Sequence, residues 1–326
     1  MTKLYKLFFV LLALCCSERL LAGDDDRVEK TKTYSKAYPV GDNERITLEN
    51  KFGDLQIKHW NKNEVQVDVT ITARASTDDR AAKILDNISI IDGKNSSGVF
   101  FRTKTGENQN QKWNKGEKQG FQIDYIVHLP AQNPLSATNE FGPLTIDNHS
   151  GEITLVSKFG SLSAGKLSQV KKIYVEFGKA SITSVNNGNI NIKFSPFQIN
   201  YLDGSVEAHF EHCSSGKLGI TNNVNELNIN NSFTPLLLDV SQDLNASFDI
   251  STSFAEVKNK TSFPIKKEGE ENKRGPQFDF RYSGKTGNGR TNMKIKTSFG
   301  EITLGHNLPF NVEEPAKKSK KTTRDI

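Results

Sequence analysis

Apolar and polar residues alternate over long stretches of this chain, and each alternating stretch is broken by one recurring motif. The segment "NKFGDLQI" (50–57) returns as "NEFGPLTI", "SKFGSLSA", "VEFGKASI" and "TSFGEITL". Side chains of a β-strand point to opposite faces in turn, so each alternating stretch predicts a short strand. The residue four before and the residue three after each Phe are apolar in every copy. The reference positions are Phe52, Phe141, Phe159, Phe177, Phe194, Phe233, Phe254 and Phe299.

The alternation changes phase at each motif. Apolar residues before the Phe share its parity, and those after it have the opposite parity. Two strands with inward faces out of step need a corner between them, and Gly suits a corner because it tolerates positive φ and close backbone contact. We therefore predict that each Phe is the last inward side chain before a bend. The structural repeat corners are Phe52, Gly53, Phe141, Gly142, Phe159, Gly160, Phe177, Gly178, Phe299 and Gly300.

The spacing of the copies predicts a solenoid. Phe141, Phe159 and Phe177 lie 18 residues apart, and the next copy follows after 17. The longer gap before Phe233 contains "SSGKLGI", which we interpret as a degenerate turn with Ser215 in the Phe place. Short strands repeated about every 18–20 residues, without a period of 3.6, indicate a stack of parallel β coils.

The residues just before successive Phe positions alternate in charge. They are Glu140, Lys158, Glu176 and Lys193. On adjacent strands about 4.8 Å apart, opposite charges make favourable cross-strand pairs. A binding stripe would have no reason to alternate in sign, so we interpret these residues as a stabilising row.

Residues 60–130 do not repeat and predict a small α+β cap on the first coil. "EVQVDVTITA", "GVFFRT" and "FQIDYIVHLP" read as strands, and "STDDRAAKILDNI" as a helix with Ser76 and Asp79 as its capping box. A cap protects the exposed strand edge at a solenoid end. The expected organisation is a signal peptide (1–22), an N-terminal extension (23–43), the first coil and cap (44–130), the solenoid (131–305) and a Pro/Lys-rich tail (306–326).

The N-terminus predicts export. Two lysines precede about ten apolar residues, and Ala22 offers a small residue before a cut. The run is too short to span a bilayer, so we expect no transmembrane segment after cleavage. Lipidation at Cys15 or Cys16 is the weaker alternative, and without it Cys213 is the one remaining cysteine, so disulfides do not hold the fold. Cleavage lowers the net charge from +5 to +3, because it removes three basic residues and one acidic residue, which gives no support to nucleic-acid binding.

The residues also carry a family likeness. "ITLENKFGDLQIKHWNKNEVQVDVTITA", then "AAKILDNISI", then the FG repeats, together resemble the secreted bacterial putative adhesins of unknown function. The resemblance covers roughly residues 34–305 and implies a mainly β, right-handed single-stranded parallel β-helix with the α+β cap. Ser195-Pro196, Thr234-Pro235 and the turn around Cys213 depart from the motif. The family brings no catalytic signature to this chain.

The chain contains little that predicts chemistry. "GKTGNGR" (284–290) lacks the upstream Gly of a phosphate loop, and His209 and His212 beside Cys213 do not converge on one strand face. Outward positions hold mostly hydroxyls and amides, which provide no general acid. They are Thr47, Ser136, Thr154, Asn189, Asn228 and Asp249 in one row, and Gln56, Thr145, Ser163, Ser181 and Gln198 in another.

We therefore predict no catalytic residues, no cofactor site and no metal site. The expected function is that of an exported, non-enzymatic scaffold or adhesin-like binding protein in the periplasm, on the outer membrane surface or outside the cell. Its partner would be an envelope or surface glycan or protein of unknown identity. A glycan-processing β-helix enzyme and a periplasmic sensing component are the alternatives.

Overall fold

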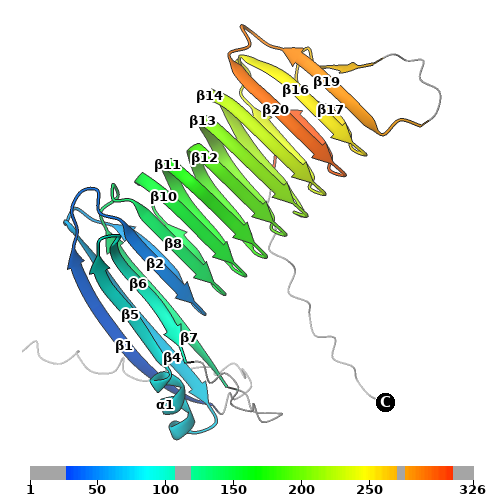
Figure 1. Cartoon of the computed structure of the whole chain (residues 1–326). Helices are drawn as coiled ribbons and strands as arrows, with labels where there is room; N and C mark the ends of the chain where they lie inside the picture. Colours follow the sequence, from blue (N-terminus) through cyan, green and yellow to red (C-terminus); the bar gives the residue numbers. More distant parts are fainter. Residues whose placement is uncertain (1–26, 107–118, 270–275, 311–326) are drawn as a thin grey trace, which may run out of the picture.

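The computed structural model describes residues 27–106, 119–269 and 276–310 (Figure 1). The predicted signal peptide, Cys15, Cys16 and most of the predicted tail lie outside these residues. The prediction of a mainly β chain is confirmed: the strands form one large sheet with parallel and antiparallel pairings that is not closed on itself. None of the described helices is long and apolar enough to cross a membrane.

The strands that precede the motif Phe residues form one continuous row. Each pairs in parallel and in register with its neighbours, so equivalent residues of successive repeats lie side by side. Along the row the order is β2 (Ile46–Lys51), β8 (Leu135–Glu140), β10 (His149–Lys158), then the second halves of β11 (Ser161–Glu176), β12 (Lys179–Lys193), β13 (Phe197–Glu211) and β14 (Gly216–Ser232), then β20 (Thr291–Ser298) and β16 (Ala246–Ser253).

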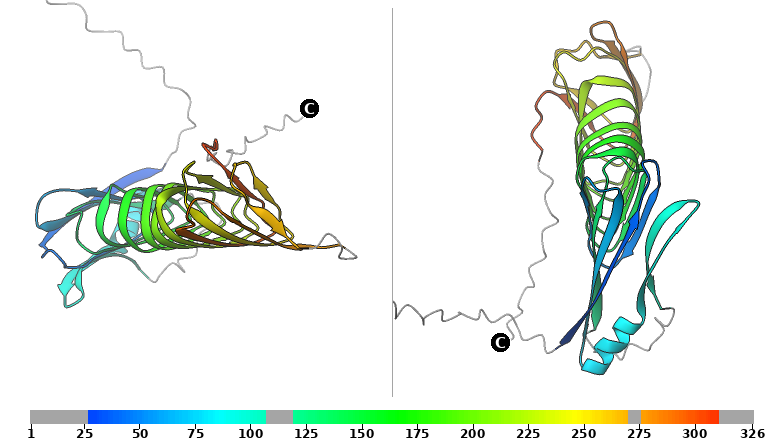
Figure 2. Two further views of the ribbon diagram at one scale, coloured as in Figure 1. Left: turned by 90° about the horizontal axis from the view of Figure 1, so that it is seen from above. Right: turned by 90° about the vertical axis from the view of Figure 1, so that its left-hand side faces the viewer.

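The strands that follow the Phe residues form a second row. The first halves of β11 to β14 lie in its middle, because each of these strands bends once and contributes to both rows. The remaining members are β3 (Leu55–His59) and β9 (Leu144–Ile146) at one end, and β15 (Leu236–Val240), β21 (Ile302–Gly305) and β17 (Val257–Asn259) at the other. Figure 2 shows the resulting stack of narrow turns from two sides. We call each pass of the chain through the two rows, with its motif copy, a rung.

The core lies between the rows and is built by the predicted alternation. Leu48, Ala137, Leu155, Ile173 and Ile190, each four residues before a motif Phe, are all fully buried. The positions three residues after the Phe are buried as well, except Val257, which is half-buried in the last short strand. Equivalent positions of successive rungs therefore form columns of aliphatic side chains. These columns supply most of the buried apolar surface.

The N-terminal end carries a cap made by strands and one helix. β6 (Gly98–Thr105) and β7 (Gly120–Leu129) extend the two rows in parallel beyond β2 and β3. β5 (Ile88–Asn95), β4 (Glu64–Ala75) and β1 (Val28–Pro39) then pair antiparallel at the edges. β1 lies within residues 23–43, which the sequence analysis assigned to an N-terminal extension.

The predicted helix forms as α1 (Asp78–Asp86), and its buried residues are Ala81 and Leu85. Its N-cap is Thr77, whose hydroxyl accepts a hydrogen bond from the backbone N–H of Arg80 at 3.4 Å. The prediction of Ser76 in this role was wrong by one residue: Ser76 instead accepts from the Arg80 side chain at 3.0 Å.

The C-terminal rungs do not follow chain order. β20 pairs in parallel with β14 on one side and with β16 on the other, so the last rung of the sequence lies between two earlier ones (Figure 1). β21 lies between β15 and β17 in the same way. Beyond β16 the row ends in antiparallel β19 (Asp279–Lys285) and β18 (Lys266–Glu268), so the last parallel strand of this row is covered.

Candidate binding surface

The motif Phe side chains lie on the surface. Phe159 is 48% exposed, Phe52 is half-buried, and the other six are 42–52% exposed, so the prediction that they point inward was wrong. The cause is the backbone: every motif Phe has φ between +49° and +65°. A left-handed residue interrupts the alternation at the Phe itself and turns its side chain out of the core.

The exposed rings stack into one continuous column, which we call the aromatic ladder. Neighbouring ring centroids are 4.6–5.3 Å apart and the ring planes deviate from parallel by 1–6°. Its order is Phe52, Phe141, Phe159, Phe177, Phe194, His212, Phe233, Phe299 and Phe254. Phe121 contacts the first ring edge-on, and Phe278 stacks on the last.

The ladder presents ring edges to its surroundings. Inside the column both faces of each ring are covered by neighbouring rings at about 5 Å. Sugars bind aromatic residues by stacking on ring faces, and such faces are not available here. The ladder is therefore an apolar ridge suited to packing against another apolar surface.

The motif Gly residues serve close backbone contact. A Cβ at Gly160 would lie 1.9 Å from the carbonyl oxygen of Gly142, and one at Gly178 would lie 1.8 Å from that of Gly160. No motif Gly has a positive φ, so of the two reasons expected for Gly at the corner, positive φ was wrong and close backbone contact holds. The Phe takes the left-handed conformation, and the following Gly allows rungs to approach at the corner.

A polar residue two positions before the Phe supports the corner from inside. Asn139 is fully buried, and its Nδ2 donates hydrogen bonds to the carbonyl oxygens of Gly53, Gly142 and Pro143 at 3.0, 2.9 and 2.9 Å. Asn50 and Asn231 occupy equivalent places and also donate to buried carbonyls. These residues were not predicted from the sequence. An Asn, Ser or Thr at this position in most copies could have indicated them.

The degenerate rung between Phe194 and Phe233 has its corner at His212. The His212 ring lies in the ladder, 5.3 Å from Phe194 and 4.6 Å from Phe233, and its φ is +53°. The assignment of Ser215 to the Phe place was therefore wrong. Cys213 is buried beside it, and burial raises the pKa of its thiol. His209 lies on the outward face of β13 with Glu207 at 3.2 Å.

The charged residues before the Phe positions form a row beside the ladder, and it is longer than predicted. It runs Lys51, Glu140, Lys158, Glu176, Lys193, Glu211, with each residue in register with the next. We call it the charge row. Ion pairs join Lys51 to Glu140 at 3.0 Å and Lys193 to Glu211 at 2.8 Å. The hydrogen bond from Lys193 lowers the pKa of Glu211.

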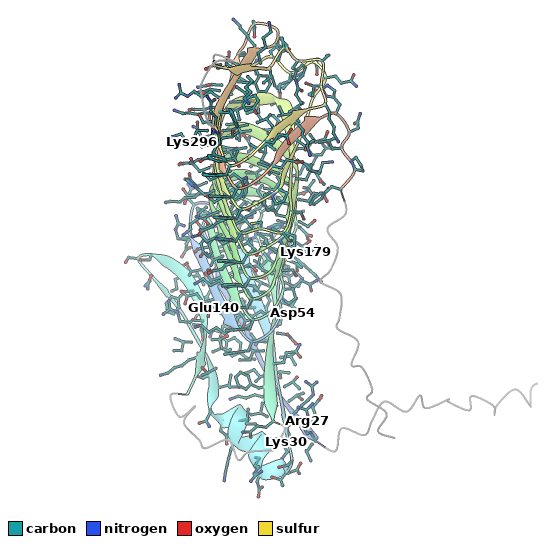
Figure 3. All side chains as sticks on the ribbon, turned by 90° about the vertical axis from the view of Figure 1, so that its right-hand side faces the viewer. Arg27, Lys30, Asp54, Glu140, Lys179 and Lys296 are labelled. Atoms are coloured by element: carbon teal, nitrogen blue, oxygen red, sulfur yellow. The ribbon has the colours of Figure 1, made fainter. Side chains whose placement is uncertain are left out.

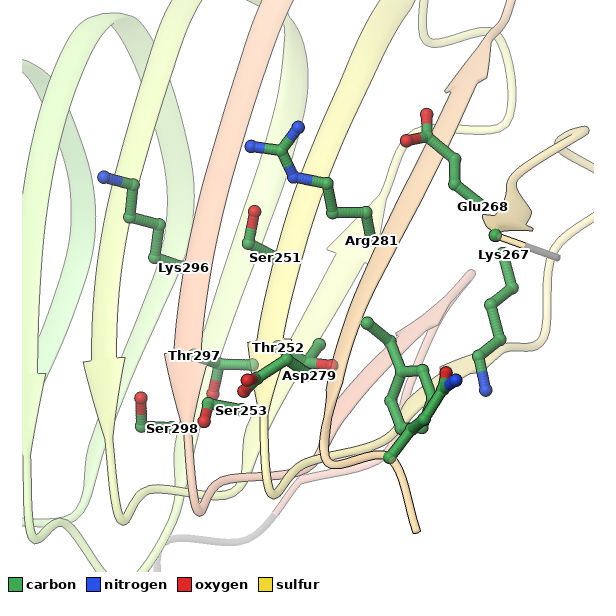
Figure 4. Close-up of a pocket in the computed structure, with 13 residues that line it drawn as sticks. Ser251, Thr252, Ser253, Lys267, Glu268, Asp279, Arg281, Lys296, Thr297 and Ser298 are labelled. Carbon is green, nitrogen blue, oxygen red and sulfur yellow. The ribbon is translucent and has the colours of Figure 1, made fainter. Parts of the chain in front are cut away.

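The C-terminal rungs carry a groove of about 1060 Å³ along β16, β19 and β20 (Figure 4). Its floor includes the hydroxyls of Ser251, Ser253 and Ser298, and Lys296, Arg281 and Asp279 stand around it. Charges of both signs line the groove, so its electrostatics favour neither anions nor cations. Within the described ranges no group of three or more His, Cys, Asp or Glu residues could hold a metal ion.

The outward columns of the two rows carry the side chains expected from the alternation. Ser136, Thr154 and Asn228 are half-buried on the outer face of the first row, and Asn189 and Asp249 are exposed there. Asp249 stands in register with Lys294 on one side and Ser283 on the other. Neither of these two in-register neighbours is a carboxylate.

Substitution of Phe159 separates a surface role from a core role. Phe159→Ala removes two ring contacts and should lower the free energy of unfolding by about 1–3 kcal/mol, less than the 3–5 kcal/mol typical of a buried Phe. Phe159→Gly should be less damaging than Phe159→Ala, because Gly adopts the left-handed backbone without strain. Urea unfolding of both variants, with Leu155→Ala as the buried control, tests this order. A larger loss for Gly than for Ala would contradict it.

No family model matches this chain, and no curated protein matches it. Three solved structures are similar over 84% of its length. They are a putative cell adhesion protein from Clostridium sporogenes (13% identity, 99% of that chain, TM-score 0.27), a putative adhesin from Bacteroides fragilis (9%, 97%, 0.34) and a putative lipid binding protein from Parabacteroides distasonis (10%, 96%, 0.26). They agree with the predicted resemblance in name, but similarity at this level transfers no residue role to this chain.

Proposed function

We propose that this chain is an exported, non-enzymatic scaffold or adhesin-like binding protein of the cell envelope or cell surface. Its parallel rungs would be the coils of a right-handed parallel β-helix, which the in-register pairing of β8 with β10 and of β11 with β12 supports. The observation that carries the proposal is the repetition of its outer face. Hydroxyl and amide side chains recur there on many rungs, together with charged ones such as Lys172, Glu207 and Lys294, and offer an extended surface for hydrogen bonding.

In a binding surface of this kind, the binding energy is spread over many rungs. Many similar rungs contact the ligand, so no single polar residue should be indispensable. An enzyme differs, since loss of one general acid or base costs about 10²–10⁴ in rate. The ligand we favour is a glycan or protein of the envelope, because columns of hydroxyls and amides match sugar hydroxyls and peptide groups equally well.

The test uses residues 23–326, which contain every described residue. Asn228→Ala alters one rung, and Asp249→Asn removes one carboxylate of the outward row. Binding to purified cell-wall and extracellular polysaccharides is measured together with release of products. We expect at most a several-fold loss of binding in either variant and no products. Product formation that Asp249→Asn abolishes would favour the glycan-processing alternative.

Location is tested separately by cell fractionation and by proteolysis of intact cells. A surface scaffold should be cut by added protease in intact cells. Protection in intact cells, with release on opening of the outer membrane, would favour the periplasmic sensing component.

A further inference from the structure

The aromatic ladder and the charge row lie next to each other along the same rungs. The six charged residues immediately precede six ladder rings, namely Phe52, Phe141, Phe159, Phe177, Phe194 and His212. Figure 3 draws the side chains of the described residues and labels Glu140, a member of the charge row. The surface therefore combines an apolar ridge with a strip of fixed charges.

The charge row is complementary to itself when it is reversed. It reads plus, minus, plus, minus, plus, minus from Lys51 to Glu211, and the next three rungs carry Ser232, Ser298 and Ser253 in the same place. An alternating row with an even number of members places opposite charges together when a second copy runs antiparallel. The same two copies placed parallel and in register would put Lys against Lys and Glu against Glu.

The innermost two charges are the ones left available for a partner. Lys51 and Glu140 pair within the chain, as do Lys193 and Glu211. Among the described residues, neither Lys158 nor Glu176 has an ion-pair partner within 4.0 Å. Glu176 accepts a hydrogen bond from the Tyr174 hydroxyl at 2.9 Å, and Lys158 lies 5.8 Å from the centre of the Tyr174 ring. These two residues flank the midpoint of the row.

We propose that this surface binds a second copy of the same chain in an antiparallel arrangement, with the two-fold axis between the rungs of Lys158 and Glu176. Lys158 of each copy then faces Glu176 of the other, and the six ladder rings of one copy pack edge-on against those of the other. Such an interface is isologous, as a closed dimer requires. Six rungs span only about 25 Å at the usual strand spacing, so the contact is small and the dimer is expected to dissociate on dilution.

The decisive experiment exchanges the central charges. In Lys158→Glu, Glu faces Glu at the axis, and in Glu176→Lys, Lys faces Lys. Each variant alone should dimerise at least about tenfold more weakly than the parent. An equimolar mixture of the two variants restores two Lys–Glu pairs and should form a heterodimer of nearly parental affinity. Sedimentation velocity of residues 23–326 over a concentration series at low salt measures this, and higher salt should weaken the parent dimer.

The mixture separates association from effects within one chain. Both variants place like charges next to each other in their own row, so a row that only stabilises the fold would lose stability in both and regain nothing on mixing. Lys166→Glu is the control for Lys158→Glu, because it makes the same charge change at an exposed position of β11 outside the charge row. It should leave the dimer intact. A parent that remains monomeric at every soluble concentration would overturn the proposal. A mixture of the two charge variants that associates no more strongly than either variant alone would also overturn the proposal. Binding of lipid vesicles to the ridge would not restore it.

Discussion

Gly160→Val is expected to lower the free energy of unfolding by more than about 4 kcal/mol, at the extreme end of single substitutions. The new Cβ would lie 1.9 Å from the carbonyl oxygen of Gly142 and 2.6 Å from its carbonyl carbon. These are backbone atoms of the adjacent rung, and they cannot move aside without breaking the parallel pairing on both sides. Thermal and urea unfolding of the variant measure the loss, and failure to fold at 25 °C is within the expected range.

Ser161→Val is the matched control for Gly160→Val. Ser161 is the next residue, is only half-buried, and begins β11 in register with Lys179. A β-branched residue is favourable at such a position, so this variant should change stability by less than about 1 kcal/mol. Similar melting temperatures for the two variants would show that close contact at the corner does not limit folding.

The strands and their inward faces could be predicted from the sequence, but the orientation of the Phe rings could not. Period-two alternation placed Leu155 and Leu162 in the core, and both are buried. Applied to Phe159, the same rule failed because it assumes an extended backbone up to the corner. Phe159 has a φ of +55°, a conformation that aromatic residues seldom adopt. Nothing in one strand's pattern reveals that stacking between rungs favours an aromatic residue there.

Polar positions inside the corner were missed for a related reason. Asn139 and Asn231 share the inward parity of the neighbouring aliphatic residues, yet polar residues are usually assigned to the surface. Their burial is tolerated because each side-chain N–H group donates to carbonyl oxygens at the bend, for example those of Gly142 and Thr234. His212 was missed because Gly216, four residues later, occupies the place that lies three residues after the Phe in other rungs.

The order of the rungs lies beyond what the motif can specify. All copies present equivalent edges, so the sequence does not show that β20 is inserted between β14 and β16. The insertion joins residues 226–232 to residues 292–298. Contacts between such distant segments cost loop entropy, and this end of the chain is therefore expected to complete its folding late.

A pair of histidines, one buried and one half-buried, lies where the cap meets the first rungs. His149 is 1% exposed, and its Nε2 lies 3.0 Å from the carbonyl oxygen of Asn133. A carbonyl can only accept, so Nε2 carries the proton and the neutral ring uses Nδ1 as an acceptor. Nδ1 lies 3.2 Å from Nε2 of His59, which donates to it. A second proton on His149 would replace this hydrogen bond by two opposed donors.

Acidification from pH 6.5 to pH 4 is expected to remove about 3 kcal/mol of stability through His149. Burial, with a smaller effect of His59, lowers the pKa of His149 from 6.5 to about 4 in the folded chain. Between these two values the unfolded chain binds more protons than the folded chain. Its free energy of unfolding is therefore full above pH 6.5 and falls as the pH falls, by at most about 1.4 kcal/mol per unit.

His149→Gln supplies the comparison, because Gln can still donate to the Asn133 carbonyl but does not titrate. Urea unfolding at several pH values from 7.5 to 5 should show a clear slope in the parent and a much flatter one in the variant. The pKa of Glu152 is lowered by its hydrogen bond from Arg45, so this carboxylate loses its contribution only in the more acidic range. His59, whose pKa is also lowered by burial, contributes to the slope that remains in the variant. Equal slopes in both proteins would mean that His149 is not held neutral by the fold.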